Sequence, residues 1–93
     1  MPTKTFPYSE DTRRLIGANI RRLRETSGMP VTALAEGAGI KRGYWYEIES
    51  GLPNVTIDVL DRIAGELSKA LGREVEARDL LTDPPKRREL ARR

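Results

Sequence analysis

The sequence predicts a compact all-α domain of five helices. Apolar residues recur at three- and four-residue spacing over residues 10–26, 31–38, 41–50 and 57–71, and "VEARDLL" (75–81) predicts a short fifth helix. A glycine lies within two residues of the end of each of the first four segments, and no segment has the alternating pattern of a strand. A chain of 93 residues suits one small domain, whose limited core would gain from pairing with a partner or a second copy.

The first predicted helix begins after Ser9, a good N-cap, and carries Glu10 and Asp11 in its first turn, where negative charge suits the helix dipole. Pro30 suits the start of the second helix, because a first-turn residue has no intrahelical N–H bond to lose. Gly37 lies inside that short helix and costs about 1 kcal/mol relative to alanine. We therefore expect packing, rather than intrinsic propensity, to hold the second helix.

The third helix follows the turn at Gly39 and should end at Gly51, with Trp45 and Ile48 facing inward. Thr56 is placed to cap the fourth helix. The apolar stripe expected on that helix consists of Ile57, Leu60, Ile63, Ala64, Leu67 and Leu71. Leu80 and Leu81 of the last helix should return to the same core.

The chain divides into three predicted parts. Residues 1–8 form an N-terminal arm without periodicity, residues 9–82 form the domain, and residues 83–93 form a basic tail after Pro84 and Pro85. From Thr82 to Arg93 the chain carries five basic residues against two acidic ones, out of a net charge of +3. Such a tail suits nucleic acid or an anionic surface, or simply a solvated end.

The composition excludes several kinds of function. The chain has no cysteine and no histidine, which removes the usual zinc sites and the Cys-His and Ser-His catalytic pairs. We expect no enzyme activity, no metal and no cofactor. No apolar run approaches the roughly 20 residues of a membrane span, and the N-terminus lacks a signal-like apolar stretch, so we expect a cytoplasmic protein without a membrane partner.

Two short helices joined by a glycine turn predict a helix-turn-helix. The crossing of the helices requires a small residue at Ala35, and the chain reversal at Gly39 favours a positive φ, which is cheap for glycine. The side chains that must then face inward are all apolar: Leu34, Ala38, Ile40, Trp45 and Ile48. The small residue at the helix crossing, the glycine at the chain reversal and the apolar inward positions all predict the same helix-turn-helix motif.

The segments "IGANIRRLRE", "LAEGAGIKRGYWYEIESG" and "TIDVLDRIAGEL" resemble the Cro/C1 (Xre-type) family of phage-repressor-like, or lambda repressor-like, DNA-binding regulators, over about residues 15–81. The resemblance implies that helix 41–50 is the recognition helix, which enters the major groove of double-stranded DNA. It also implies a structural ion pair between Arg24, late in the first helix, and Glu49, just before the glycine that ends the third.

The resemblance further implies which residues meet DNA. The positions that correspond to base-reading residues are Lys41, Arg42, Gly43, Tyr44 and Glu47. Phosphate contacts are expected near the helix N-termini and at Val31, Tyr46, Asn54 and Thr56. This sequence departs from the family pattern at Pro30 and Val31, where relatives carry polar residues, at Lys41, where a serine or threonine cap is common, and at the bulky Trp45.

These features lead to two function hypotheses. The first is a sequence-specific transcriptional regulator, a repressor that binds a palindromic site as a homodimer in the cytoplasm of a bacterium or phage-infected cell, close to the nucleoid. The second is an antitoxin or other protein-interaction module with the same fold, for which DNA binding is secondary. The arm around Phe6 and the basic tail would then be docking segments for a protein partner.

Overall fold

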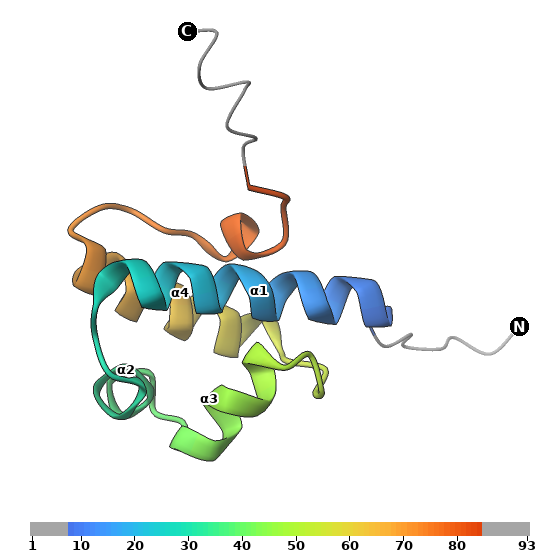
Figure 1. Cartoon of the computed structure of the whole chain (residues 1–93), viewed down its shortest axis with the longest axis horizontal. Helices are drawn as coiled ribbons and strands as arrows, with labels where there is room; N and C mark the ends of the chain where they lie inside the picture. The colour runs from blue at the N-terminus through green and yellow to red at the C-terminus, as the bar shows by residue number, and fades with distance from the viewer. Residues whose placement is uncertain (1–7, 85–93) are drawn as a thin grey trace, which may run out of the picture.

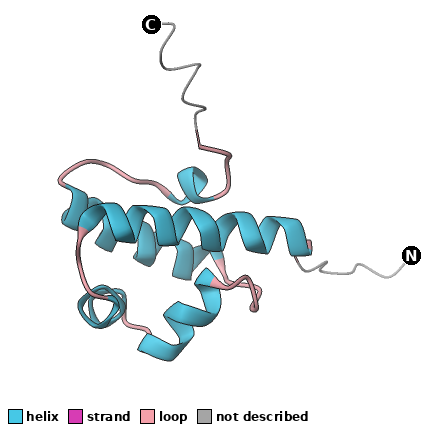
Figure 2. Ribbon diagram, in the orientation of Figure 1, coloured by secondary structure: helices cyan, strands magenta, loops and turns pink. Residues whose placement is uncertain are grey.

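A computed structural model describes residues 8–84 of the chain (Figure 1). Its elements are α1 (Glu10–Ser27), α2 (Val31–Ala38), α3 (Arg42–Glu49), α4 (Ile57–Leu71) and the 3-10 turn η1 (Ala77–Leu80). Within residues 8–84 there is no strand (Figure 2), which agrees with the predicted all-α class. The arm residues 1–7 and the tail residues 85–93, to which the sequence assigns docking or electrostatic roles, lie outside the described residues.

The predicted count of five helices is not reproduced, because a single 3-10 turn stands where the fifth helix was expected. Ser68 Oγ accepts a hydrogen bond from Val75 N (2.8 Å) and donates one to Val75 O (3.0 Å). Glu76 and Asp79 then form a reciprocal capping box around η1. Ser68 occupies Val75 O, which a longer α-helix would have paired with Asp79 N, and the capping box fixes Glu76 as the residue before the helical segment, so that segment is only four residues long.

The other helix boundaries follow local capping. Ser9 Oγ accepts from Thr12 N, and Thr56 Oγ1 accepts from Val59 N, as their positions predicted. Gly39, at the turn between α2 and α3, has φ 74°, which is a left-handed conformation that glycine adopts without a Cβ penalty. Its N–H bonds back to the end of α2, so the chain reverses within three residues.

The core lies where α1, α2, α4 and η1 meet, and α3 closes it from one side. α3 packs against α1 and α2, whereas η1 packs against α1 and α4. In Figure 1 the two elements accordingly lie on opposite sides of α1, with α3 below it and η1 above. The predicted inward residues of the turn are in the core: Leu34, Ala35, Ala38, Trp45 and Ile48 are buried, and Ile40 is half-buried against them.

Three predicted core positions differ from the structure. Ile57 is 55% exposed, because it opens α4 beyond the packed part of the bundle and Val55 of the preceding loop fills the core instead. Leu71 at the other end of α4 and Leu81 after η1 are only half-buried. No helix in residues 8–84 is both long and apolar enough to cross a bilayer.

Candidate functional site

The inner face of α3 is joined to α1 by a buried ion pair. Arg24 Nε and Nη2 lie 2.6 and 3.0 Å from Glu49 Oε2 and Oε1, so the predicted pair is present and bidentate. The Glu49 side chain is 7% exposed, and Trp45 Nε1 donates a third hydrogen bond to it at 2.7 Å. The hydrogen bond to Glu49 is the main cause that raises the pKa of Arg24 above its ordinary value, so the guanidinium stays charged at physiological pH.

The bond between Trp45 and Glu49 was not predicted from the sequence. Trp45 was expected only as a buried ring, and it is fully buried. A buried indole N–H needs an acceptor, and Glu49 lies four residues later on the same helix, where side chains meet. That spacing was the available signal. Trp45 therefore adds a polar contact to the ion pair.

A second connection between α1 and α3 comes from Gly17, which sequence reasoning passed over. A Cβ at this position would lie closer than 3.0 Å to the backbone carbonyl groups of Ile48 and Glu49. The two helices therefore approach at a distance that only glycine permits. The signal in the sequence was a glycine in the middle of an otherwise good helix, a position that usually has a packing reason.

The third connection lies at the end of α3, where α1 and the start of the domain meet the following loop. Arg13 donates from Nε to Gly51 O (3.0 Å) and from Nη1 to Tyr8 O (2.7 Å). Tyr8 N donates to Asn54 Oδ1 at 2.8 Å. Tyr8, which the sequence analysis placed in the N-terminal arm, is thus half-buried against the domain and helps to hold the loop after α3.

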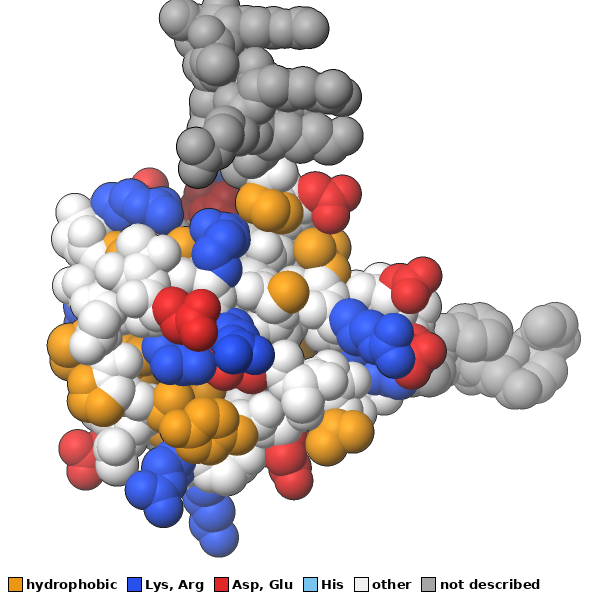
Figure 3. Space-filling view, in the orientation of Figure 1, with side chains coloured by type: hydrophobic (Ala, Val, Ile, Leu, Met, Phe, Trp, Pro, Cys, Tyr) orange, Lys and Arg blue, Asp and Glu red, His pale blue; other side chains and the backbone are white. Residues whose placement is uncertain are grey.

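The outer face of α3 is polar and free of such contacts. Arg42, Gly43, Tyr46 and Glu47 are all exposed, and their spacing of i, i+1, i+4 and i+5 puts them on one side of the helix. Within residues 8–84, none of the three side chains among them makes a hydrogen bond or ion pair. Figure 3 shows blue, basic side chains at the lower edge of the molecule, over the start of α3.

The aromatic residues of α3 divide between the two faces. Tyr44 is half-buried and packs against the core cluster, so it stands at the edge of the outer face rather than within it. Tyr46, which was assigned to a phosphate, is 50% exposed and lies between Arg42 and Glu47 on the helix surface. Lys41 is exposed and occupies the N-cap position of α3 without a side-chain capping bond.

The expected phosphate-contact residues occupy different environments. Val31 is buried in the core, so its side chain cannot contact a phosphate, and its backbone N–H lies in the first turn of α2, where helix N–H groups have no intrahelical partner. Asn54 uses its Oδ1 for Tyr8, which leaves the amide Nδ2 as a donor. Thr56 Oγ1 already accepts from Val59 N, and Thr56 is exposed at the start of α4.

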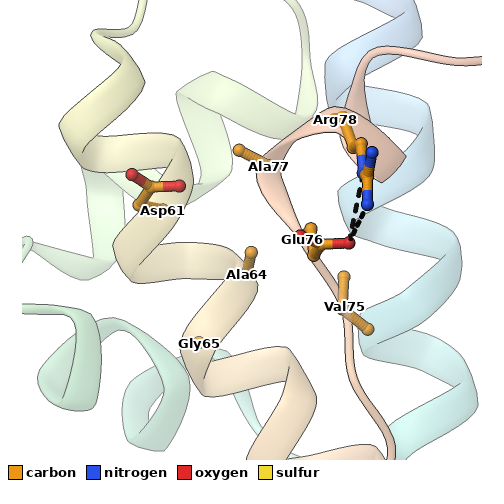
Figure 4. A pocket seen from close by; sticks show the side chains of 7 residues that line it. All are labelled: Asp61, Ala64, Gly65, Val75, Glu76, Ala77 and Arg78. Atoms are coloured by element: carbon orange, nitrogen blue, oxygen red, sulfur yellow. Dashed lines mark hydrogen bonds and ion pairs between the residues drawn. The ribbon is translucent and has the colours of Figure 1, made fainter.

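One hollow of the surface, of about 600 Å³, is an open groove between α4 and the segment around η1 (Figure 4). Its floor includes Ala64 and Gly65, and its rim carries Asp61 and the ion pair between Arg78 and Glu76. No group of three or more acidic, histidine or cysteine side chains in the described part of the chain is placed to hold a metal ion.

These features define a helix-turn-helix protein: two short helices around a glycine turn, with the second helix fixed on its inner face and open on its outer face. The family model described as "Helix-turn-helix domain" matches residues 15–81, and the chain belongs to that family. The predicted family is thus confirmed. A search of curated proteins found no match.

Solved structures with the same fold include three that are similar over most of the chain. The hypothetical transcription factor NHTF from Neisseria has a TM-score of 0.70 at 24% identity, covering 96% of this chain and 97% of that one, and this likeness concerns the fold. The restriction-modification controller protein C.AhdI from Aeromonas hydrophila has a TM-score of 0.58 at 29% identity, covering 73% and 94%. The clp gene regulator ClgR from C. glutamicum has a TM-score of 0.58 at 29% identity, covering 84% and 90%.

Proposed function

We propose that this protein is a transcriptional repressor that binds double-stranded DNA sequence-specifically by inserting α3 into the major groove. The family and the regulators of similar structure support a DNA-binding transcriptional regulator. The observation that carries the proposal is the outer face of α3, where Arg42, Gly43, Tyr46 and Glu47 are exposed together on a helix whose other side is tied to α1. A helix that is fixed on its inner face and polar on its outer face is suited to contact base edges in the major groove.

Within this proposal the exposed side chains have separate roles. Arg42 donates a bidentate pair to guanine O6 and N7, and Glu47 accepts from cytosine N4. Gly43 has open space around it and lets a base or the DNA backbone come close to the helix. Tyr44, at the edge, touches a thymine methyl group or a phosphate, and Lys41 stands at the entry of the helix into the groove.

The DNA backbone is held around this helix by phosphate contacts. The free N–H groups at the start of α2, Val31 included, and at the start of α4 after Thr56 suit phosphate oxygens. Asn54 Nδ2 and the Tyr46 hydroxyl supply further donors. The basic tail adds sequence-independent attraction. The proposal assigns no catalytic step and no cofactor, and it places the protein in the cytoplasm, with the nucleoid.

The test is selection of bound DNA from a random double-stranded pool, followed by titration of the best site at several salt concentrations. We expect a palindromic site and a binding constant that falls steeply as salt rises, because phosphate contacts release counterions. Arg42→Ala should cost about 1–3 kcal/mol of binding and relax the preference at one base position. A pool that yields no enriched sequence would contradict the proposal, and unchanged selectivity of the variant would remove Arg42 from the readout.

A second candidate function is a protein-interaction module such as an antitoxin. It is favoured by the start of α2, where Pro30 has no N–H and makes no side-chain cap bond and where the Val31 side chain is buried, so that this end offers few phosphate contacts. Co-purification of the untagged protein with the product of an adjacent gene, together with weak DNA selection, would support it. Strong selection of one DNA site without any protein partner would contradict it.

A further inference from the structure

One buried polar side chain holds the C-terminal end of the described chain against α1. Asn19 is 2% exposed and is the one buried polar or charged residue within residues 8–84. Its Nδ2 donates to Leu80 O (3.0 Å) and to Thr82 O (2.9 Å), and its Oδ1 accepts from Arg22 Nη2 (3.3 Å). A buried amide whose donors and acceptor are all in use holds its neighbours in one arrangement. Asn19 therefore fixes the place where the chain leaves the domain.

This exit lies on the side of α1 that faces away from α3. Gly17 and Arg24 make contacts of α1 with α3. Asn19 follows Gly17 by two residues and Arg22 precedes Arg24 by two, so at 3.6 residues per turn the members of each pair point about 160° apart. In Figure 1 the described chain accordingly ends above α1, with α3 below it. We name the side with Asn19, Arg22 and Thr82 the back of the domain.

The residues that follow the exit are strongly basic. Residues 85–93 lie outside the described residues, and their sequence, "PKRRELARR", has five basic residues against one acidic residue. Three of the basic residues come within four positions of Pro84, namely Lys86, Arg87 and Arg88. An extended chain spans at most ~3.5 Å per residue, so the backbone of these three residues stays within about 14 Å of the exit.

The DNA that α3 reads would lie farther from the exit than this. The shortest way around α1 is half the circumference of a helix 10–12 Å wide, or about 17 Å, and α3 adds roughly another 10 Å before its outer face is reached. The whole path is about twice what four residues can span. Only Arg92 and Arg93 are far enough along the chain to reach the front, and then only in a fully extended chain. The first three basic residues are therefore available to a partner at the back.

We propose that Lys86, Arg87 and Arg88 bind a second DNA duplex at the back of the domain. The protein then links two duplexes, one read by α3 and one held through its phosphates. The inference rests on the proposed DNA-binding function and gives the basic tail a partner of its own. The second contact reads no sequence, because cations on phosphates carry no information about the bases.

The composition of the basic segment favours duplex DNA over other anionic partners. Residues 85–93 contain no aromatic residue and one large apolar residue, Leu90. Single-stranded nucleic acids are bound largely by aromatic stacking, membranes by apolar anchors in addition to charge, and protein partners by buried aromatic or apolar anchors. The phosphates of a duplex attract cations without any such anchor. A segment that offers charge alone therefore suits the duplex best.

The described part of the back adds no net charge of its own at this place. The hollow beside the exit is lined by two arginines and two aspartates: Arg22, Arg73, Asp79 and Asp83. Arg22 donates to Asn19, and Asp79 Oδ2 accepts from Glu76 N, so one residue of each charge is also held by the domain. The attraction for a second duplex therefore comes from the residues after Pro84, and these are the residues to change.

The first experiment asks whether the full chain holds two duplexes at once. A duplex with the site selected from the random pool is fixed to beads, and a labelled duplex without the site stays in solution. We expect the wild type to retain the labelled duplex, and Arg87→Gln/Arg88→Gln to retain it about tenfold more weakly per bound protein while binding the fixed site within about threefold of the wild type. Arg14→Gln/Lys69→Gln removes the same charge from exposed ion pairs elsewhere and should retain it like the wild type.

The possible outcomes separate this inference from the proposed function. A wild type that binds the fixed site but retains no labelled duplex overturns the inference and leaves the proposed function intact. The same holds if the Arg87/Arg88 variant retains as much as the control, because an unoccupied α3 would then explain the capture. Retention of labelled single-stranded RNA in place of the duplex also overturns the inference. If the pool yields no site but duplex binding still falls in the Arg87/Arg88 variant, the proposed function fails and the contact of the tail with DNA stands.

The second experiment maps which duplex lies at the back. The chain has no cysteine, so Thr82→Cys or Leu52→Cys supplies a single point for attaching an iron chelate that cleaves nearby DNA. Both residues are exposed; Thr82 lies at the exit, and Leu52 N bonds to Glu47 O at the end of α3. With both duplexes present, we expect the chelate at Leu52 to cleave the duplex with the site and the chelate at Thr82 to cleave the other. Cleavage of the duplex with the site from Thr82, when no second duplex is present, would overturn the inference.

Discussion

α3 presents two faces that are constrained in opposite ways. On the inner face, Glu49 accepts three hydrogen bonds from Arg24 and Trp45, and Gly17 of α1 admits a contact closer than any side chain would allow. On the outer face, Arg42 and Gly43 have no packing role in the described part of the chain. Both faces belong to the same eight-residue helix.

The difference shows that the two faces of α3 serve separate purposes, stability on the inner face and binding on the outer face. The inner face is a set of contacts that depend on one another, so a change there should alter stability. The outer face contributes little to stability and even contains a glycine that weakens the helix, so a change there should alter binding instead. Each of the following variants tests one side of this comparison.

Glu49→Ala should give the largest loss of stability. It leaves the Arg24 guanidinium and the Trp45 N–H without their acceptor in a largely buried place, which should cost about 3–5 kcal/mol. Urea unfolding measures the loss, and the fluorescence of Trp45, the chain's single tryptophan, should report the changed environment. Glu10→Gln, which breaks the exposed pair with Arg14, is the control and should cost about 0.5 kcal/mol or less. Similar losses of stability in both variants would contradict the prediction that the buried contacts of Glu49 contribute more than an exposed ion pair.

Trp45→Phe should cost about 2–3 kcal/mol in the same assay. The substitution removes a hydrogen bond to a charged acceptor and leaves a gap beside a fully buried ring. Tyr46→Phe on the outer face is the matched control, and its stability should stay within about 0.5 kcal/mol of the wild type. A Trp45→Phe protein as stable as the control would show that the indole bond contributes little to holding α3.

Gly17→Ala should cost about 2 kcal/mol, because the new methyl group pushes α3 away from α1. Gly65→Ala is the control: this exposed helical glycine has open space around it, so alanine there should be neutral or stabilising by up to about 1 kcal/mol. Chemical unfolding of the two variants side by side gives the comparison. If the two variants are equally stable, α1 and α3 can move apart at Gly17 without a loss in the free energy of unfolding.

Gly43→Ala should have the smallest effect on stability. We expect it to raise the free energy of unfolding slightly and to lower the affinity for DNA. The methyl group meets no other atom within 4 Å, so the fold should gain up to about 1 kcal/mol. If DNA comes close to this point of α3, binding to the selected site should weaken. Gly65→Ala should gain similar stability with unchanged DNA binding. Unaltered DNA affinity of Gly43→Ala would move the closest approach of DNA away from Gly43.

Local signals in the sequence were enough to predict the four α-helices and the turn between α2 and α3. Ser9 and Thr56 cap the helices that follow them, and Gly39 adopts the left-handed conformation expected of it. These features depend on residues a few positions apart, so they can be predicted from short stretches of chain. The inward direction of Trp45 and Ile48 followed from helical periodicity in the same way.

The predicted contacts of the DNA-reading residues remain predictions, since they concern a partner outside the chain. For Tyr44 the periodic pattern alone was insufficient: it stands near the boundary between the two faces, and packing against the core decided that it is half-buried. For Ile57 the pattern was misleading, since an apolar residue at the first position of α4 lies beyond the reach of the other helices.

The sequence by itself determined the class of fold, the extent of the four α-helices and the side of α3 that faces the core, because capping, glycine turns and apolar spacing act over a few residues. Only the tertiary structure decided that Glu49 also receives the Trp45 N–H, that Gly17 is the point of closest approach, that Tyr8 joins the domain, and that a 3-10 turn replaces the last helix. The closest approach and the docking of Tyr8 join residues more than thirty positions apart. The indole bond and the 3-10 turn span a few residues, but they depend on which groups the packed helices bury and which they leave free.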